Sequence, residues 1–237
     1  MLGLISFCVF LLFGCAEPLP NNDMKSTEIP TTGKQVKRST SDKIKDEDFN
    51  SFISSFTEKE LPIIANSGYA DDFKIFTVDS RDSRKIDRET AIKHLCGGDM
   101  KLSKEPEGGL YEYYYGYRFS SDNFICVLYY KPSVDYFNGY YIATFDFSGN
   151  LISNQVVAGD LWEQSQLESV ITKDYEIKSI ELLYTYPKVE SYKEIEAYRV
   201  NKYYKITDKG EIVFQKEDDM GQVTCIVTEN GRLIIKE

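Results

Sequence analysis

The sequence predicts an α+β protein in which two N-terminal helices pack on a large antiparallel β-meander. Before residue 110, two short segments carry apolar side chains with helical spacing. From residue 111 onward, short segments alternate between apolar and polar residues, as half-buried strands do. One glycine-containing turn motif recurs between those segments. The pattern leaves open whether the strands form one sheet or two smaller ones.

The first predicted helix begins at the acidic residues 46–48. Four large apolar residues follow with spacing i, i+3, i+4 and i+7, and they are Phe49, Phe52, Ile53 and Phe56. This spacing places them on one helical face, which we expect to pack against the rest of the domain. Acidic groups at a helix start complement its dipole and can cap it.

The second predicted helix covers residues 87–96. Asp87 can cap its start, Ala91 and Leu95 belong to its buried stripe, and the two glycines at 97–98 end it. His94 is predicted to lie at the surface or at the helix end. Between the two helices, residues 73–78 read as a short strand.

The strand region begins with an aromatic run. In a regular strand, five aromatic residues would share one face, and they are Tyr111, Tyr113, Tyr115, Tyr117 and Phe119. A face of this kind is too apolar for water, so it is predicted to form core. Tyr114 would then lie on the opposite, outer face. Further strands are predicted at residues 124–131, 140–145, 151–157, 177–186, 196–206, 211–215, 222–228 and 232–236.

Three connections share one turn motif, at residues 146–152, 207–213 and 228–234. Each has a small polar residue, two spacers, a glycine, one further residue and two aliphatic residues. The glycine supplies the positive φ angle that a short hairpin loop needs. Because the copies are irregularly spaced, they indicate repeated turn chemistry rather than a solenoid or a propeller.

The N-terminus reads as an export signal. Residues 2–14 are almost entirely apolar and uncharged, but they are too few to cross a bilayer as a helix, which takes about 20 residues. Leu12-Phe13-Gly14-Cys15 resembles the lipobox of bacterial lipoproteins. That resemblance implies lipidation of Cys15, which becomes the mature N-terminus and anchors the chain in the membrane. The alternative is ordinary signal cleavage after Ala16.

The resemblance also implies an address. Ala16 follows the lipidated residue, where an Asp is the usual inner-membrane retention signal in diderm lipoproteins. We therefore expect a cell-envelope protein, in the outer membrane if the organism is diderm. The predicted organisation is a signal peptide at 1–14, a lipidated Cys and disordered tether at 15–45, a helical part at 46–110 and an antiparallel β-sheet region at 111–237.

Composition excludes several functions. The net charge of −10 disfavours nucleic acid, because phosphate binding needs a basic face. His94 is the only histidine, so no site that needs two histidines can form. The acidic clusters at 71–72 and 217–219 lack the alternation of a calcium loop and are interpreted as turn charge. We predict no catalytic residue, no metal and no cofactor.

Cysteines and aromatic residues supply the remaining candidates. Cys126 and Cys225 lie in predicted strands and can form a disulfide if those strands are neighbours. Buried free thiols are an equally weighted alternative. Tyr114 and Trp162, the sole tryptophan, are candidates for stacking a ligand such as a sugar ring.

The leading hypothesis is a membrane-anchored, non-catalytic binding module of the cell envelope. Apart from the membrane itself, its partner would be a glycan, a peptide or an envelope protein. One alternative is a hydrolase that uses two carboxylates. Another is an envelope assembly factor or a factor that neutralises another protein, for which a bare edge strand would be evidence.

Overall fold

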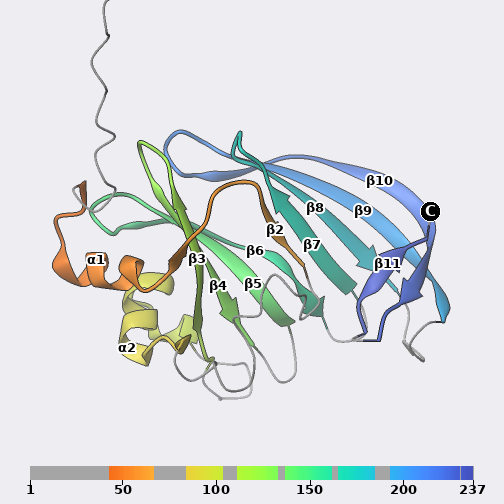
Figure 1. Cartoon of the computed structure of the whole chain (residues 1–237), viewed down its shortest axis with the longest axis horizontal. Helices are drawn as coiled ribbons and strands as arrows, with labels where there is room; N and C mark the ends of the chain where they lie inside the picture. The colour runs from red at the N-terminus through yellow and green to blue at the C-terminus, as the bar shows by residue number, and fades with distance from the viewer. Residues whose placement is uncertain are drawn as a thin grey trace, which may run out of the picture. The chain divides into compact units, whose positions relative to one another are not determined.

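The computed structural model describes residues 43–66, 84–103, 111–132, 137–161, 165–184, 193–229 and 231–236. Within these ranges the protein is mostly β-sheet, with few helices (Figure 1). The predicted large antiparallel meander is confirmed, and the strands join in one sheet rather than two. The predicted signal peptide, the tether and the predicted strand at 73–78 lie outside the described residues.

The strands are β1 (Thr57–Glu58), β2 (Ile63–Ala65), β3 (Tyr114–Ser120), β4 (Ile125–Lys131), β5 (Phe137–Phe145), β6 (Leu151–Leu161), β7 (Ser165–Ile171), β8 (Glu176–Leu183), β9 (Glu194–Ile206), β10 (Ile212–Val227) and β11 (Leu233–Ile235). The helical elements are α1 (Glu47–Ser54), α2 (Arg88–Thr90), the π-helix η5 (Ala91–Leu95) and the 3₁₀-helix η6 (Met100–Ser103). In the described part of the chain, no helix combines the length and apolarity needed to cross a membrane.

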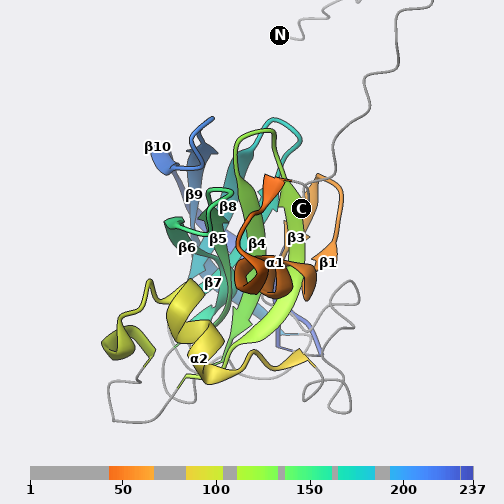
Figure 2. The same cartoon turned by 90° about the vertical axis from the view of Figure 1, so that its left-hand side faces the viewer.

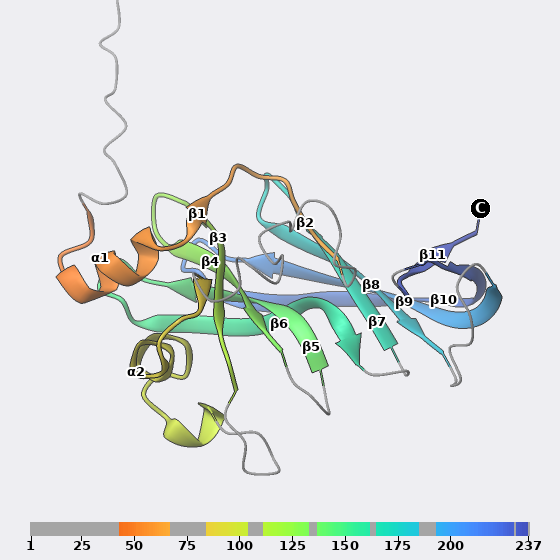
Figure 3. The ribbon, with the colours of Figure 1, turned by 60° about the horizontal axis from the view of Figure 1, so that its bottom comes forward.

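Strand order in the sheet follows the chain from β3 to β11, and each successive pair is antiparallel. Strands β6 and β7 pair over only three residues each, Gly159–Leu161 against Ser165–Leu167. Beyond that junction β2 takes the place beside β7, where Ile63 pairs with Ile171 (Figure 3). The sheet therefore has a first half, β3 to β6, and a second half, β7 to β11.

Two hydrophobic clusters bury the first half of the sheet on both faces. On one face the side chains of β3, β4 and β5 pack under α1 and the α2–η5 segment, with Phe49, Phe52 and Ile53 from α1 (Figure 2). On the other face they meet β2 and residues of the second half such as Ile177 and Ile206. A third, smaller cluster lies between β8, β9 and the β10–β11 hairpin.

The three predicted turns are confirmed, and each closes in the same way. The first residue donates its N–H to the carbonyl four residues on, as Asp146 does to Asn150 (3.1 Å) and Thr207 to Glu211 (2.8 Å). The motif glycine has a positive φ each time, 88° at Gly149, 84° at Gly210 and 80° at Gly231. Glycine adopts this conformation without the steric cost that other residues pay.

A fourth turn has this geometry but not the sequence motif. Thr172 N donates to Glu176 O (2.9 Å), and Tyr175 occupies the glycine position with φ of 60°. Its ring packs beside Phe119 and Phe124, which offsets the unfavourable backbone. Because the motif lacks its glycine here, the sequence prediction missed both this turn and the strand β7 that precedes it.

The aromatic run of β3 does not keep to one face, which corrects the prediction. A register shift separates Tyr115 from Tyr117, and Gly116 lies inside it. Tyr113 and Tyr115 consequently pack under the helices, whereas Tyr117 and Phe119 belong to the opposite cluster. A Cβ at Gly116 would lie 2.4 Å from the backbone oxygen of Leu128, so only glycine lets the two strands approach this closely.

Strand β10 corrects a second prediction. Residues 211–215 and 222–228 were expected to be separate strands, with the acidic residues 217–219 in a turn between them. The structure instead has one strand of 16 residues that pairs with β9 along its whole length. Two register shifts, between Phe214 and Lys216 and between Asp219 and Gly221, accommodate two extra residues in β10.

Candidate functional site

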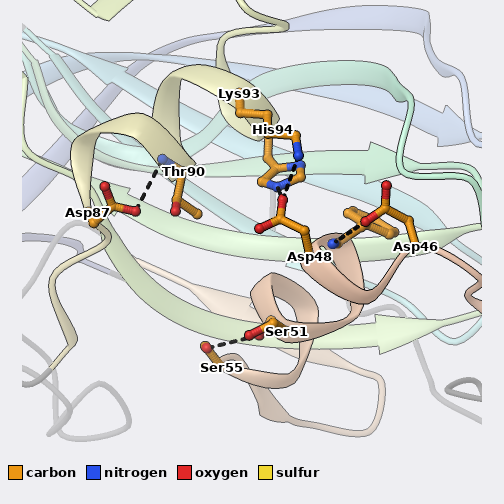
Figure 4. A network of polar contacts seen from close by, with 9 residues as sticks. Asp46, Asp48, Ser51, Ser55, Asp87, Thr90, Lys93 and His94 are labelled. Atoms are coloured by element: carbon orange, nitrogen blue, oxygen red, sulfur yellow. Dashed lines mark hydrogen bonds and ion pairs between the residues drawn. The ribbon is translucent and has the colours of Figure 1, made fainter.

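A polar network joins the two helical segments around His94 (Figure 4). Asp46 caps α1 by accepting the Phe49 N–H (3.0 Å), and Asp87 caps α2 by accepting the N–H groups of Glu89 and Thr90. Between them, Asp48 Oδ2 lies 3.0 Å from His94 Nε2 and 2.6 Å from Lys93 Nζ. The Asp48 carboxylate therefore links α1 to the π-helix η5.

His94 lies in the last turn of η5, one of the two places that the sequence predicts, but it is buried and not at the surface. Its side chain is 5% exposed, and its ring stacks on Phe52 with 4.6 Å between ring centroids. Burial lowers the pKa of His94, and the hydrogen bond to Asp48 opposes that shift. The pKa of Asp48 is lowered, chiefly by its hydrogen bond to Lys93. This balance favours a neutral imidazole that donates to Asp48.

The His94 network has the geometry of a helix joint and not of an active site. The imidazole packs against the rings of Phe49 and Phe52 and bonds through Nε2 to Asp48, so it connects η5 to α1. Cys96, two residues on, is buried and lies 3.4 Å from the hydroxyl of Tyr113. Across the described ranges, no three His, Cys, Asp or Glu side chains come together as a metal site would need.

The two residues predicted to stack a ligand are Tyr114, which the structure describes, and Trp162, which it does not. Tyr114 is 4% exposed, so its ring is not available to stack a ligand and the prediction for it is wrong. Tyr114 does lie on the face opposite Tyr113 and Tyr115, but that face is covered as well, because Tyr114 belongs to the cluster between the two halves of the sheet. The Tyr114 hydroxyl donates to Glu112 Oε2 (2.5 Å). Trp162 lies outside the described residues.

Of the two alternatives that the sequence leaves open for Cys126 and Cys225, the structure has free thiols and no disulfide between them. Both are free buried thiols, as is Cys96. Cys126 lies in β4 and belongs to the cluster between the two halves of the sheet, whereas Cys225 lies in β10 and belongs to the C-terminal cluster. Strand order in the sheet keeps these two strands apart. Cys15, the predicted lipidation site, lies outside the described residues.

The β9–β10 ribbon differs from the rest of the sheet in its exposure. Every residue of β4 from Ile125 to Tyr130 is buried, but most side chains between Val213 and Gln222 are exposed. Phe214 is 53% exposed and Met220 is 51% exposed, which is unusual for large apolar residues within a strand. The sequence signal for this region was present in the mixture of apolar residues and acids, but it was interpreted as a turn.

Among the described residues, the outer edge of β10 is unpaired over most of its length. β11 pairs only with Cys225–Val227, and among the described residues no other strand pairs with β10 on that side. At its two ends the outward-facing groups are used. Ile212 N donates to Ser153 Oγ (3.1 Å), and Thr224 O accepts from Lys236 N (2.8 Å).

The direction of the backbone groups between those ends follows from the ladder. Successive residues of an antiparallel strand direct their N–H and C=O alternately to one neighbour and to the other. The backbone N–H of Ile212 faces outward, away from β9. When the alternation is followed along the register with β9, with the extra residue of each bulge left out, the backbone groups of Thr224 also face outward, as its bond to Lys236 shows. The residues whose backbone groups face outward in between are Phe214, Glu217, Asp219 and Gln222.

The same residues carry their side chains on one face of the ribbon. The ring of Phe214 contacts that of Tyr204 (5.6 Å between centroids), and Asp219 accepts a hydrogen bond from the Tyr198 hydroxyl. Asp218, in contrast, lies on the opposite face, where Lys216 Nζ is 2.7 Å from its carboxylate. The Glu217 side chain is exposed and has no hydrogen bond or ion pair within the described chain.

Comparison with known proteins gives no relative. No family model, no curated protein and no solved structure matches the chain.

Proposed function

We propose that this chain is a lipid-anchored, non-catalytic protein of the cell envelope that binds a protein partner through the β9–β10 ribbon. The observation that carries the proposal is the bare edge of β10, flanked by the exposed side chains of Phe214 and Met220. Natural sheets cover, shorten or pair such an edge, or protect it with charges and bulges, as the acids at 217–219 and the two bulges of β10 do against pairing with a second copy. An edge of this length left open in a folded domain is consistent with a surface that a partner completes.

The ribbon favours a protein partner over a glycan. A strand edge offers a row of backbone donors and acceptors, which another polypeptide matches and a sugar does not. Glycan binding usually relies on exposed aromatic faces, and the Tyr114 ring that sequence reasoning nominated for this is buried. A protein partner is also compatible with the alternative functions of envelope assembly and neutralisation of another protein.

Membrane attachment rests on the sequence alone. Cys15 would carry the acyl chains, and each buried methylene adds about 0.8 kcal/mol to membrane binding. Radiolabelled palmitate should enter the wild-type chain and should not enter Cys15→Ser. If both chains take up the label equally, the lipid anchor is disproved while the binding proposal is unaffected.

In-cell photo-crosslinking tests the binding proposal. A photoreactive phenylalanine is placed at Phe214 or at Met220 in the full chain, and at Ile64 as a control with matched exposure of 52% on β2. Both ribbon positions should capture the same envelope protein, identified by mass spectrometry of the adduct. Ile64 should not capture it. Identical capture at all three positions, or none at the ribbon, contradicts the proposal.

A further inference from the structure

We infer that the partner of β10 is an extended basic segment with Lys or Arg at positions i and i+2, which adds to the sheet as a new edge strand opposite Glu217 and Asp219. This inference rests on the proposed function and names the chemistry of its partner.

The backbone of Glu217 and Asp219 already faces outward. An added strand would exchange its N–H and C=O groups with these two residues, two positions apart on β10. The partner residues directly opposite them would also be two positions apart, and they would carry their side chains on the same face as the two acids. Backbone pairing therefore fixes where complementary side chains must stand.

The charge of that face is negative and available. Glu217 has no ion pair within the described chain. Asp219 accepts hydrogen bonds from the Tyr198 hydroxyl and from the N–H of Gly221, which lower its pKa and keep it ionised. Lys202 lies directly opposite Glu217 on β9 and attracts it electrostatically, but its ammonium is paired with Glu181 at 2.7 Å. Opposite charges directly across a ladder stabilise the pair.

The same acids exclude a second copy of the chain. If two β10 edges paired antiparallel about Asp218, Glu217 of each copy would face Asp219 of the other. Like charges directly opposite each other destabilise a sheet. The net charge of −10 adds repulsion between copies and attraction for a basic segment at long range. The acids on this edge therefore disfavour pairing with a second β10 in this register and favour pairing with a cationic strand.

The apolar residues beside the acids fit a strand and not a flexible basic tail. Phe214 lies on the same face as Glu217, three residues earlier across a bulge, and its exposed ring adjoins Tyr204. A partner strand that continues past its two cations can cover this ring with an apolar residue. A disordered polycation would neutralise the acids but would leave the ring exposed.

The test measures the binding of short capped peptides to the whole chain at low salt, by fluorescence polarisation. The probe is Thr-Val-Lys-Val-Lys-Val-Thr. One control peptide has Glu in place of both Lys. A second carries N-methyl groups on the two Lys backbone nitrogens, which keeps the charge and removes the ladder hydrogen bonds. The Lys peptide should bind, and both controls should bind at least tenfold more weakly.

Variants of the chain locate the binding face. Glu217→Gln and Asp218→Asn each remove one negative charge from adjacent residues, but their side chains lie on opposite faces of β10. Glu217→Gln should weaken the Lys peptide, and Asp218→Asn should leave it unchanged. The double variant E217K/D219K should lose the Lys peptide by at least tenfold, equivalent to about 1.4 kcal/mol, and should gain the Glu peptide. Circular dichroism checks that each variant is folded.

Four results would overturn the inference. They are absence of binding to the Lys peptide, equal weakening by Glu217→Gln and Asp218→Asn, undiminished binding of the N-methylated peptide, and a dimer of the wild type that E217K/D219K abolishes. The last would make a second copy the occupant. If the Lys peptide fails while Phe214 and Met220 still capture one envelope protein, the proposed function stands and only the partner chemistry is wrong.

Discussion

The two halves of the sheet differ in composition, because β4 and β5 contain no acidic residue whereas β10 has Glu217, Asp218 and Asp219 near its centre. β4 and β5 have both faces covered, one by the helical segments and one by the second half of the sheet. β10 has one pairing partner along most of its length and exposes most of its side chains. Tyr130 and Phe145 thus belong to the core of the first half, whereas Phe214 in the ribbon is largely exposed.

The largest expected contrast is between two phenylalanines. Phe49 is 1% exposed and packs against Phe52, Phe145 and His94, so Phe49→Ala should cost about 3–5 kcal/mol of unfolding free energy. Phe214 is 53% exposed, and Phe214→Ala should change stability by less than about 1 kcal/mol. Urea denaturation of both variants measures the difference. Similar losses for the two would mean that the ribbon is part of the core.

Two glycines sharpen the comparison at the level of the backbone. Gly116→Ala places a Cβ against the backbone oxygen of Leu128, which cannot move without opening the β3–β4 pairing, so we expect a loss of about 3 kcal/mol. At Gly221, φ is +74° but no atom lies within 4 Å of the new Cβ, so only conformational strain of about 1 kcal/mol applies. Thermal unfolding that ranks these variants in reverse would contradict the assignment of the two bulges.

The helix joint predicts a pH dependence that the ribbon does not have. Because the folded-state pKa of His94 is lowered by burial, the unfolded chain binds a proton first as pH falls below about 6.5. Stability is then fully present above this pH and declines below it, by at most about 1.4 kcal/mol per pH unit, until the folded state is also protonated. His94→Gln should flatten the dependence between pH 7.5 and pH 5.5 in urea titrations, since His94 is the only histidine.

The smallest expected effect is at Asp218. Its ion pair with Lys216 joins two exposed side chains, and pairs of this kind contribute little. Asp218→Asn should therefore unfold at the same urea concentration as the wild type, within the scatter of repeat measurements. A clear shift in the urea midpoint would rule out this variant as the matched control for Glu217→Gln. It would also show that the face of β10 that carries Lys216 and Asp218 contributes to stability.

The sequence predicts the meander because its signals are local. Alternation within strands and the turn motif at Gly149, Gly210 and Gly231 both act over a few residues, and the structure has those turns. The prediction failed where tertiary contacts override the local pattern. Tyr175 adopts a positive φ and packs against Phe119 and Phe124. Because a tyrosine is not a sequence signal for such a turn, neither the turn nor the strand β7 before it is predicted.

The site was less predictable than the fold for the same physical reason. The second half of the sheet covers the face of β3 that the sequence predicts to be exposed, so Tyr114 is part of the core. Burial of His94 depends on α1, which lies far away in the sequence. The acids at 217–219 are typical of a turn by composition, and only pairing with β9 reveals them as the middle of a strand.

The insertion of β2 beside β7 separates the order of synthesis from the order of folding. The hairpins from β3 onward can form as each new strand emerges, because each pairs with the one made just before it. β2 is made early, but Ile63 and Ala65 can only find their partners after Ile171 and Ser169 exist. We expect the amide protons of β2 to acquire protection from exchange late in refolding, after those of β4 and β5. The apolar residues Ile63–Ala65 would thus remain exposed until β7 is available for pairing, and exposed apolar segments of partly folded chains are prone to aggregate.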